Sequence, residues 1–299
     1  MGSDVFATSA AARAAFERAD AALGERLSTL CFEGPEHDLQ LTANTQPALV
    51  ATSAALLAIF REVVDPRVQA TVAGAAGHSL GEYSALVAAG ALTLEDALRL
   101  VRVRGNAMQD AVPAGVGAMA AVMGLSADEV VALCAVAAEH ETVSPANFNG
   151  TQIVIAGHAA AVTRACALVE AAKGKAIPLR VSAPFHSALM RPAAEVMARA
   201  LASTTVNKLA FPVYANVDAE PNHDADRVAE LLVGQVAGVV RWEQTIQHLV
   251  RDGFTHAVEI GPGKVLAGLA KRIDKALVVH PVSDQNSLEA AASTLLASL

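Results

Sequence analysis

The sequence predicts an α/β protein with a doubly wound, mostly parallel sheet, an α/β-hydrolase-like core, into which a smaller subdomain is inserted. Helix-like and strand-like segments alternate along most of the 299 residues. Hydrophobic residues make up 53% of the chain and aromatic residues only 4%, so Ala, Val and Leu must fill the core, as in helices packed on a parallel sheet. A central stretch has the order β-α-β-β-α-β, which is the ferredoxin-like order.

The first part of the chain is mainly helical. Thr93-Leu94-Glu95-Asp96 resembles a capping box at a helix start. Apolar spacing and turn signals predict, in order, helices over about 9–23 and 46–63, a buried strand over 68–76 that ends in Gly77, and helices over 80–89 and 93–109.

Residues 115–182 are predicted to form the inserted ferredoxin-like subdomain, which leaves 1–114 and 183–299 for the larger catalytic subdomain. Asn149-Gly150 is a pair typical of a tight hairpin turn and joins the two middle strands. The expected elements of the insert are strands over 117–123, 142–147, 152–156 and 175–182, with helices over 126–140 and 159–172.

After the insert, helices and strands alternate again, which is what predicts a doubly wound sheet. The expected elements are helices over 187–202, 227–236, 242–252 and 265–275, strands over 210–217, 255–260 and 277–282, and a terminal helix.

Charge and composition exclude several classes of protein. The net charge of −8, from 22 basic and 30 acidic residues, argues against a non-specific nucleic-acid binder. The three cysteines form no C-x-x-C pair and no metal-ligand spacing is present, so we expect reduced thiols and no metal. No signal peptide opens the chain and no apolar run approaches about 20 residues, so we expect a cytoplasmic protein without a membrane segment.

A nucleophilic serine is the strongest chemical signal in the sequence. Gly77-His78-Ser79-Leu80-Gly81 matches G-x-S-x-G, with a predicted strand before it and a helix after it. That context is what a nucleophile elbow requires, since the turn projects Ser79 Oγ from the carboxyl edge of the sheet. The Leu80 N–H, at the start of the helix, would then face a developing oxyanion. An ordinary tight turn is the alternative.

A serine nucleophile needs a base, and His186 is the best placed of the nine histidines. Pro184-Phe185-His186-Ser187 follows the last strand of the insert, so this imidazole lies at a subdomain junction, where sites are common. The residues alone leave open whether it is a base or an incidental histidine.

Arg104 differs from the other arginines of its predicted helix because it shares the apolar face with Leu100, Val101 and Met108. Its side chain could extend to solvent or pair with a carboxylate of another element. Alternatively it could hold a substrate carboxylate bidentately. Sequence alone does not decide among these.

Two glycine-rich stretches imitate nucleotide-binding motifs. The stretch that begins at Gly115 resembles a dinucleotide motif, but it follows a helix and Pro113 rather than a strand. Gly261-Pro262-Gly263-Lys264 lacks the further Gly and Ser/Thr of a phosphate loop, so it is interpreted as a strand-to-helix turn with an anion contact possible at the helix start.

Taken together, seven blocks of sequence resemble the malonyl-CoA:acyl carrier protein transacylases of fatty-acid synthesis, a family close to the acyltransferase domains of polyketide synthases. The resemblance covers nearly the whole chain and includes a ferredoxin-like insert in an α/β subdomain. The blocks are Asn44-Thr45-Gln46-Pro47-Ala48-Leu49, Gly77-His78-Ser79-Leu80-Gly81-Glu82-Tyr83, Val103-Arg104-Gly105, Ser144-Pro145-Ala146-Asn147-Phe148-Asn149, Pro184-Phe185-His186-Ser187, Asn216-Val217-Asp218 and Gly261-Pro262-Gly263-Lys264-Val265-Leu266.

The resemblance implies a role for each matching residue. Ser79 would be the acylated nucleophile, His186 its base, and the backbone carbonyl of Gln235 would orient the imidazole. The Leu80 N–H would contribute to the oxyanion hole, and Arg104 would clamp the malonyl carboxylate. The residues implied to line the acyl and substrate site are His78, Met108, Asn147, Val181 and Phe185, the last resembling malonyl-type motifs.

The implied reaction is ping-pong transfer of malonyl from malonyl-CoA to the phosphopantetheine thiol of acyl carrier protein, without a cofactor. The carrier would be an acidic, transient partner of a monomer, and a basic rim would face it, with candidates Arg191, Lys264, Lys271 and Arg272. A serine hydrolase or thioesterase, and a weakly active carrier-binding homologue, are the competing hypotheses.

One departure from the family pattern lies at the N-terminus. The family begins with a strand and a Gly-Gln-Gly-Ser-Gln loop that supplies a second oxyanion N–H, and neither precedes Met1-Gly2 here. Because Met1-Gly2 coincides with an internal Met-Gly of the pattern, we expect a start placed too late rather than a shortened protein. The chain as written is then expected to be poorly stable or weakly active.

Overall fold

The computed structural model describes residues 1–181 and 183–299. Its helices are α1 (Ser3–Thr8), α2 (Ala10–Leu23), α3 (Leu27–Glu33), α4 (Glu36–Leu39), α5 (Thr42–Val63), α6 (Pro66–Gln69), α7 (Gly81–Ala88), α8 (Leu94–Asp110), α9 (Ala127–Ala138), α10 (Ala159–Ala171), the short 3₁₀ turn η1 (Ala188–Met190), α11 (Arg191–Ala202), α12 (Ala225–Ala237), α13 (Trp242–Arg251), α14 (Val265–Ile273) and α15 (Gln285–Ala297). Its strands are β1 (Ala75–Ala76), β2 (Gly117–Met123), β3 (Val143–Phe148), β4 (Gln152–His158), β5 (Lys175–Pro178), β6 (Val213–Tyr214), β7 (Pro221–Asn222), β8 (His256–Ile260) and β9 (Val278–Val282).

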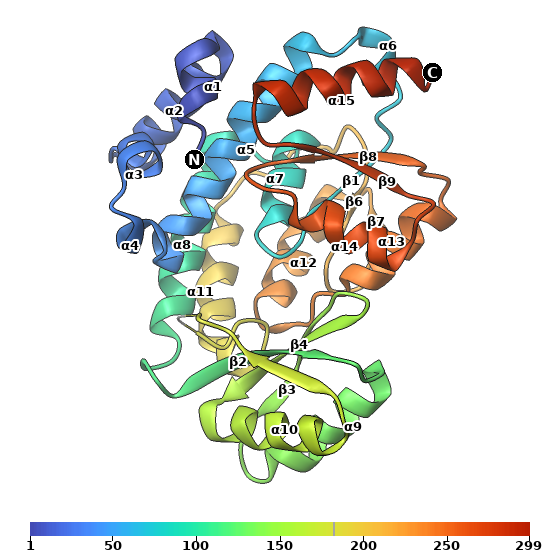
Figure 1. Ribbon diagram of the computed structural model, residues 1–299. Coiled ribbons are helices and arrows are strands. Elements are labelled where there is room, and N and C mark those ends of the chain that lie inside the picture. Colours follow the sequence, from blue (N-terminus) through green and yellow to red (C-terminus); the bar gives the residue numbers. More distant parts are fainter. Residues whose placement is uncertain (182) are drawn as a thin grey trace.

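The larger subdomain is an α/β layer structure with helices on both faces of its strands (Figure 1). β1 and β6 are parallel, β7 pairs antiparallel with β6, and β8 and β9 form a separate parallel pair. α15 packs on β9 and on α5 from one side, and α14 contacts β9 as well. The described strands thus have the alternating, mainly parallel character that the sequence predicts.

Two predicted core strands are much shorter than expected. The stretch 68–76 was expected to be one strand, but its start belongs to α6 and only Ala75–Ala76 is extended. Asp65 caps that helix by accepting a hydrogen bond from Arg67 N, with Pro66 in the first turn, a start signal that outweighs the β-branched residues. Similarly, of the strand expected over 210–217 only Val213–Tyr214 pairs.

The central helix α5 begins at Thr42, earlier than predicted, and is long and apolar enough by length and composition to cross a membrane. The expectation that no apolar run approaches such a length was therefore wrong. In the structure 56% of its most apolar window is buried, because α5 packs against α2 and α8. It is the core helix of the larger subdomain.

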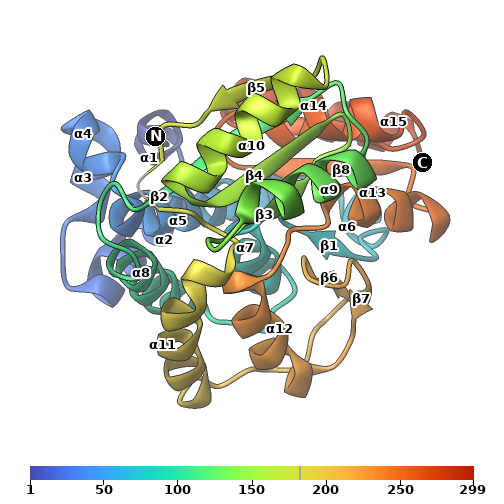
Figure 2. The same cartoon turned by 90° about the horizontal axis from the view of Figure 1, so that it is seen from below.

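The insert contains an antiparallel sheet in the order β3-β4-β2-β5 with α9 and α10 beside it (Figure 2). Side chains alternate between its two faces. Ala120, Val122 and Ile155 pack under the helices in the insert's own core, whereas Met119 and Val154 form a cluster on the other face. The order of the elements is the ferredoxin-like one that was predicted. Ser182, the last residue of the expected final strand and of the expected subdomain 115–182, lies outside the described residues.

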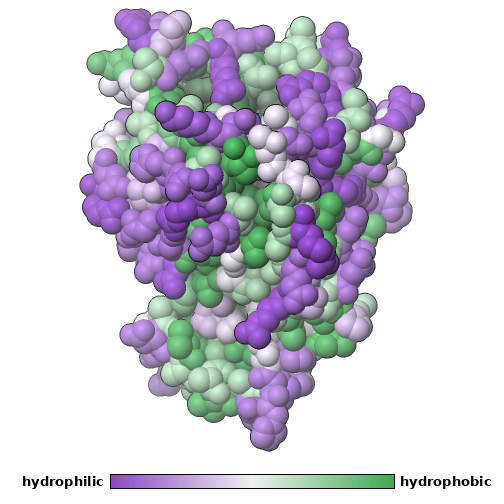
Figure 3. Space-filling model, turned by 180° about the vertical axis from the view of Figure 1, so that it is seen from behind, coloured by the Kyte–Doolittle hydropathy of each residue, from purple (hydrophilic) through white to green (hydrophobic). Residues whose placement is uncertain are grey.

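Hydrogen bonds between backbones join the insert to the larger subdomain. Val240, just before α13, donates to the Ala146 carbonyl and accepts from Phe148 N, at 2.9 Å each. A bulge in β3 at Pro145–Asn147 makes room for this bridge. Seen from behind, apolar surface gathers in the middle of the molecule and at the lower end, where the insert lies, while polar side chains cover most of the upper part (Figure 3).

A close approach between α5 and α8 brings their polar side chains together. A Cβ at Gly105 would lie 2.7 Å from Ala43 Cα, so only glycine allows the two helices to come this near. As a result the guanidinium of Arg104, the residue before Gly105, donates a hydrogen bond to the side-chain amide of Gln46 on α5.

Candidate active site

The G-x-S-x-G stretch forms a tight turn between β1 and α7, with Ser79 itself in the left-handed region at φ 51°. A Cβ at Gly77 would lie 2.0 Å from the Gly81 carbonyl group, whereas a Cβ at Gly81 would meet nothing within 4 Å. The first glycine is therefore sterically required, and the backbone strain is carried by the serine. This is the elbow geometry that the motif predicts.

Asn216, which follows β6, holds this turn on both sides of the serine. Its Oδ1 accepts from Ser79 N at 2.6 Å and its Nδ2 donates to the Gly77 carbonyl at 2.7 Å. The side chain is fully buried, so these bonds are not in competition with water. The short parallel pairing of β1 with β6 places Asn216 beside the turn.

Ser79 and His186 meet across the subdomain junction, with Oγ and Nε2 2.7 Å apart. The other ring nitrogen, Nδ1, lies 2.9 Å from the Gln235 carbonyl and 3.2 Å from the Gly238 carbonyl. Because carbonyl oxygens only accept, Nδ1 carries the proton and the Nε2 lone pair faces the serine hydroxyl. The structure thus brings together the predicted Ser79, His186 and the backbone of Gln235.

The imidazole is held in its neutral form. His186 is 4% exposed, and burial, reinforced by the Arg104 guanidinium, lowers its pKa to about 3. At neutral pH it can therefore take a proton from Ser79 without first losing one. His186 also has a positive φ, 56°, so both members of the pair sit in a strained backbone conformation.

Arg104 is buried at the centre of the site, with 2% of its surface exposed. Its Nη1 donates to Gln46 Oε1 at 2.8 Å, and its Nη2 donates to Gln235 Oε1 at 2.8 Å and to Ser79 Oγ at 3.1 Å. Among the described residues no carboxylate forms an ion pair with it, and its Nε has no hydrogen-bond partner. Of the three alternatives left open above, extension to solvent is excluded and a protein carboxylate partner is not observed.

The Leu80 N–H stands at the N-terminal end of α7 with no acceptor in the part of the chain that the structure describes. Its neighbours Gly81, Glu82 and Tyr83 bond back to residues 78–80. A free N–H at this position, beside the nucleophile, is suited to stabilise negative charge.

The remaining predicted site residues differ in their placement. His78 Nε2 lies 2.9 Å from Asn149 Oδ1, and Met108 Sδ lies 3.8 Å from Gln46 Nε2. Asn147 is buried at the bulge that bridges to Val240. Phe185 packs against the apolar face of the insert.

Val181 is the exception among them. The structure leaves it 42% exposed on the chain after β5. β5 ends at Pro178, so Val181 lies beyond the strand, and its place near the acyl pocket stays a prediction.

Sequence reasoning missed three buried polar residues that shape the site, namely Gln46, Glu82 and Asn216. Each lies in a block that carried the family resemblance. The available signal was a polar side chain in an apolar surrounding, but sequence cannot tell which partner such a group will find.

The turn at Gly261 does not offer a free helix terminus. Glu259 accepts from Leu266 N at 2.9 Å and from Ala267 N at 2.7 Å. The chain's own carboxylate therefore occupies the start of α14, and the anion contact considered there is not available.

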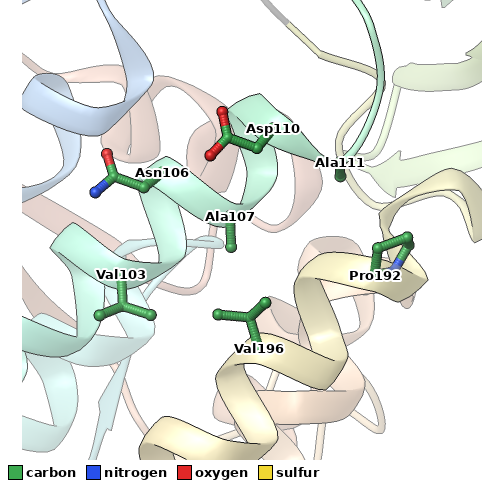
Figure 4. A pocket seen from close by; sticks show the side chains of 7 residues that line it. All are labelled: Val103, Asn106, Ala107, Asp110, Ala111, Pro192 and Val196. Carbon is green, nitrogen blue, oxygen red and sulfur yellow. The ribbon is translucent and has the colours of Figure 1, made fainter.

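A separate hollow of about 320 Å³ lies between α8 and α11 (Figure 4). Val103, Ala107 and Val196 face one another across it, with Asp110 at its edge. It contains none of the predicted site residues, so the chemistry lies elsewhere. No group of three or more His, Cys, Asp or Glu side chains able to hold a metal occurs among the residues that the structure describes.

Comparison with known proteins agrees with this geometry. The acyl transferase domain family matches residues 1–289. The malonyl CoA-acyl carrier protein transacylase of Escherichia coli K12 is 45% identical over 280 residues, covering 92% of this chain and 89% of the relative. That of Bacillus subtilis is 44% identical over 298 residues, covering 99% and 92%.

Solved structures give the same result. An acyl-carrier-protein-S-malonyltransferase from Bartonella henselae superposes with a TM-score of 0.95 and 46% identity, covering 99% of this chain and 94% of that one. A malonyl-transacylase solved in complex with its type II PKS acyl-carrier protein gives a TM-score of 0.94 and 40% identity, covering 98% and 94%.

The two glycines of the elbow provide a matched test of the geometry. Gly77→Ala should lower the free energy of unfolding by more than about 3 kcal/mol, because its Cβ has no room beside the backbone of Gly81. Gly81→Ala should be neutral or stabilising by up to about 1 kcal/mol, because the space is open and alanine favours the helix. Equal unfolding midpoints for the two variants in urea would contradict this account.

Proposed function

We propose that this chain, which belongs to the acyl transferase domain family, transfers the malonyl group of malonyl-CoA to the phosphopantetheine thiol of acyl carrier protein. One observation carries the proposal. The buried guanidinium of Arg104, which pairs with no carboxylate among the described residues, lies 3.1 Å from the oxygen of a serine that is hydrogen-bonded to a neutral histidine. That arrangement suits an acyl group that bears its own carboxylate. The activity for which the relatives are named supports it.

In the first half-reaction, Ser79 Oγ attacks the thioester carbonyl carbon while its proton passes to His186 Nε2. The negative charge of the tetrahedral intermediate forms near the Leu80 N–H. The C–S bond then breaks, the CoA sulfur takes the proton from His186, and malonyl-Ser79 remains. The Gln235 carbonyl stabilises the imidazolium through the Nδ1–H bond.

The second half-reaction reverses these steps with a different thiol. The phosphopantetheine thiol gives its proton to His186 and attacks the malonyl ester carbon. The bond to Ser79 Oγ breaks, and the oxygen recovers the proton from the imidazole. No cofactor takes part in this proposal, because both substrates carry the sulfur that the exchange requires.

Arg104 selects the acyl group by charge. A malonyl carboxylate would pair with the guanidinium in a site from which water is largely excluded. An acetyl group would leave the same cation buried and without a counter-ion, which costs free energy of the order of a few kcal/mol.

The competing serine hydrolase does not fit the base. Such enzymes place a carboxylate on the histidine Nδ1, whereas here two backbone carbonyls, of Gln235 and Gly238, occupy that position. The malonyl transferase proposal is therefore the one supported by the site.

We further propose that an acidic carrier protein docks transiently beside α14. Lys264, Lys271 and Arg272 are exposed on or next to this helix. The hairpin turn of the insert reaches the end of the same helix, since a Cβ at Gly150 would lie 2.8 Å from Ile273 Cγ1. The cations thus lie near the junction that holds the site, whereas Arg191 is on α11.

The covalent intermediate provides the direct test of function. After incubation with malonyl-CoA, intact mass should show one malonyl group on the protein, and addition of phosphopantetheinylated carrier should move it to the carrier. Ser79→Ala should carry none, because it lacks the attacking oxygen. Release of free malonate at the same rate with and without carrier would instead support a hydrolase.

Charge selection is tested by Arg104→Ala. Malonyl loading should fall by about 10²-fold or more while acetyl loading improves, because the variant no longer buries an unpaired cation. Arg99→Ala, an exposed arginine on the same helix, is the matched control and should change neither. Equal losses for both acyl groups would defeat the proposed role.

Docking is tested by reversing charge on α14. The double variant Lys271→Glu, Arg272→Glu should raise the KM for the carrier protein several-fold, which corresponds to a loss of about 1 kcal/mol or more of binding free energy. The KM for malonyl-CoA should stay unchanged. Arg199→Glu on α11 is the control. An unaltered carrier KM in the double variant would place docking elsewhere.

A further inference from the structure

A buried carboxylate lies directly behind the active site. Glu82, on the first turn of α7, is 3% exposed. Its Oε2 accepts from Gln235 Nε2 at 2.8 Å and from Asn216 N at 3.1 Å. Within the described residues it has no ion-pair partner. Burial of a charged carboxylate without a cation in contact costs free energy, which indicates that the carboxylate has a function at this position.

A single amide separates this carboxylate from the buried guanidinium. Gln235 presents Nε2 to Glu82 and Oε1 to Arg104, each at 2.8 Å. Because an ionised carboxylate only accepts and a guanidinium only donates, the two charges determine which way the amide points. The backbone carbonyl of the same Gln235 bonds His186 Nδ1. Glu82 and Arg104 are therefore linked through the side chain of the residue whose backbone orients His186.

The charges in this enclosed space balance only when the site is empty. Ionised Glu82 and Arg104 sum to zero, and a malonyl carboxylate on Arg104 adds one uncompensated negative charge. A net buried charge is expensive in a medium of low dielectric constant. Arginine cannot take another proton, so the excess must be neutralised at a group that can.

Glu82 is the group able to accept that proton at neutral pH. Burial raises its pKa to about 7, although bonds from Gln235 and Asn216 and the charge of Arg104 lower it and Asp218 raises it. The pKa of Tyr83, beside it on α7, is raised to about 12. His78 and His186 are kept neutral by burial, with lowered pKa values. Pairing of Arg104 with a substrate anion would remove its attraction for the Glu82 charge.

We propose that Glu82 is a positioning residue that couples malonyl loading to the uptake of one proton. Above neutral pH the carboxyl group is ionised while Arg104 has no anion, and it takes a proton from solvent when the malonyl carboxylate pairs with Arg104. The proton returns to solvent when malonyl leaves on the carrier. In both forms Oε2 accepts the same two hydrogen bonds, so the Gln235 amide stays in place. This inference rests on the proposed function.

The test compares two acyl groups over a range of pH. For the unaltered chain, the KM for malonyl-CoA should rise from pH 7 to 9, approaching tenfold per pH unit above the pKa of the carboxyl group, because ionised Glu82 must be protonated on binding. The KM for acetyl-CoA should stay flat, because its acyl group is uncharged and its CoA phosphates are the same. This comparison needs no variant.

Glu82→Gln supplies the second arm, since its amide oxygen can accept the same two hydrogen bonds without charge. The KM of this variant for malonyl-CoA should be flat over the same range. Glu95→Gln, which removes a half-buried carboxylate paired with Arg18 on the surface, should keep the original slope. A Glu82→Gln variant that keeps the slope would assign the titration to another group and overturn the inference.

Two further outcomes distinguish a failure of this inference from a failure of the proposed function on which it rests. If the unaltered chain forms malonyl-Ser79 with the same KM at pH 7 and 9, coupling is wrong and the transferase proposal stands. If no malonyl adduct forms at any pH, the proposed function fails and the inference falls with it.

Discussion

The arrangement of the site depends on one fully buried side chain, Gln235 on α12. Its backbone carbonyl determines the tautomer of His186, its Oε1 holds Arg104, and its Nε2 bonds both Glu82 and the Ser79 carbonyl. The nucleophile, the base and the cation are thus all hydrogen-bonded to a single residue. A change in the direction of the amide would break its hydrogen bonds to Arg104, Glu82 and the Ser79 carbonyl. The bond to His186 comes from the backbone of the same residue and fixes the position of Gln235 beside the base.

Three elements of the fold meet at the buried position of this amide. The elbow after β1 projects Ser79, the close approach of α8 to α5 delivers Arg104, and the chain returning from the insert brings His186. Both Ser79 and His186 have a positive φ. Such strain persists only where surrounding contacts over-determine the backbone, and the two bonds from Asn216 provide that restraint at the elbow.

The sequence predicted well the features that depend on neighbouring residues in the chain. The strand–turn–helix context identified Ser79. Thr93 caps α8 as the pattern indicates, and Asn149-Gly150 is the hairpin turn between β3 and β4. One failure came from a competing local signal. Val68 was assigned to a strand, although the capping of α6 by Asp65 decides its conformation.

Buried polar partners could not be predicted for a different reason, because they are distant from one another in the sequence. Nothing near Glu82 in the sequence shows that its carboxylate will meet an amide 153 positions later. Arg104 was recognised as unusual because it shares an apolar helix face, but its three partners come from three other elements. A helix-face argument can therefore identify a buried charge, whereas only the tertiary structure shows what holds it.

The use of a carbonyl rather than a carboxylate to orient His186 follows from the cation beside it. A triad carboxylate on Nδ1 would lie close to Arg104, since that guanidinium already contacts the same serine oxygen as the imidazole. Such a carboxylate would compete with the substrate carboxylate for the guanidinium, because both are anions in one enclosed space. The Gln235 carbonyl orients the ring without adding charge. The nearest buried carboxylate, Glu82, is kept behind the Gln235 amide, where it can balance Arg104 and still leave the guanidinium open toward Ser79.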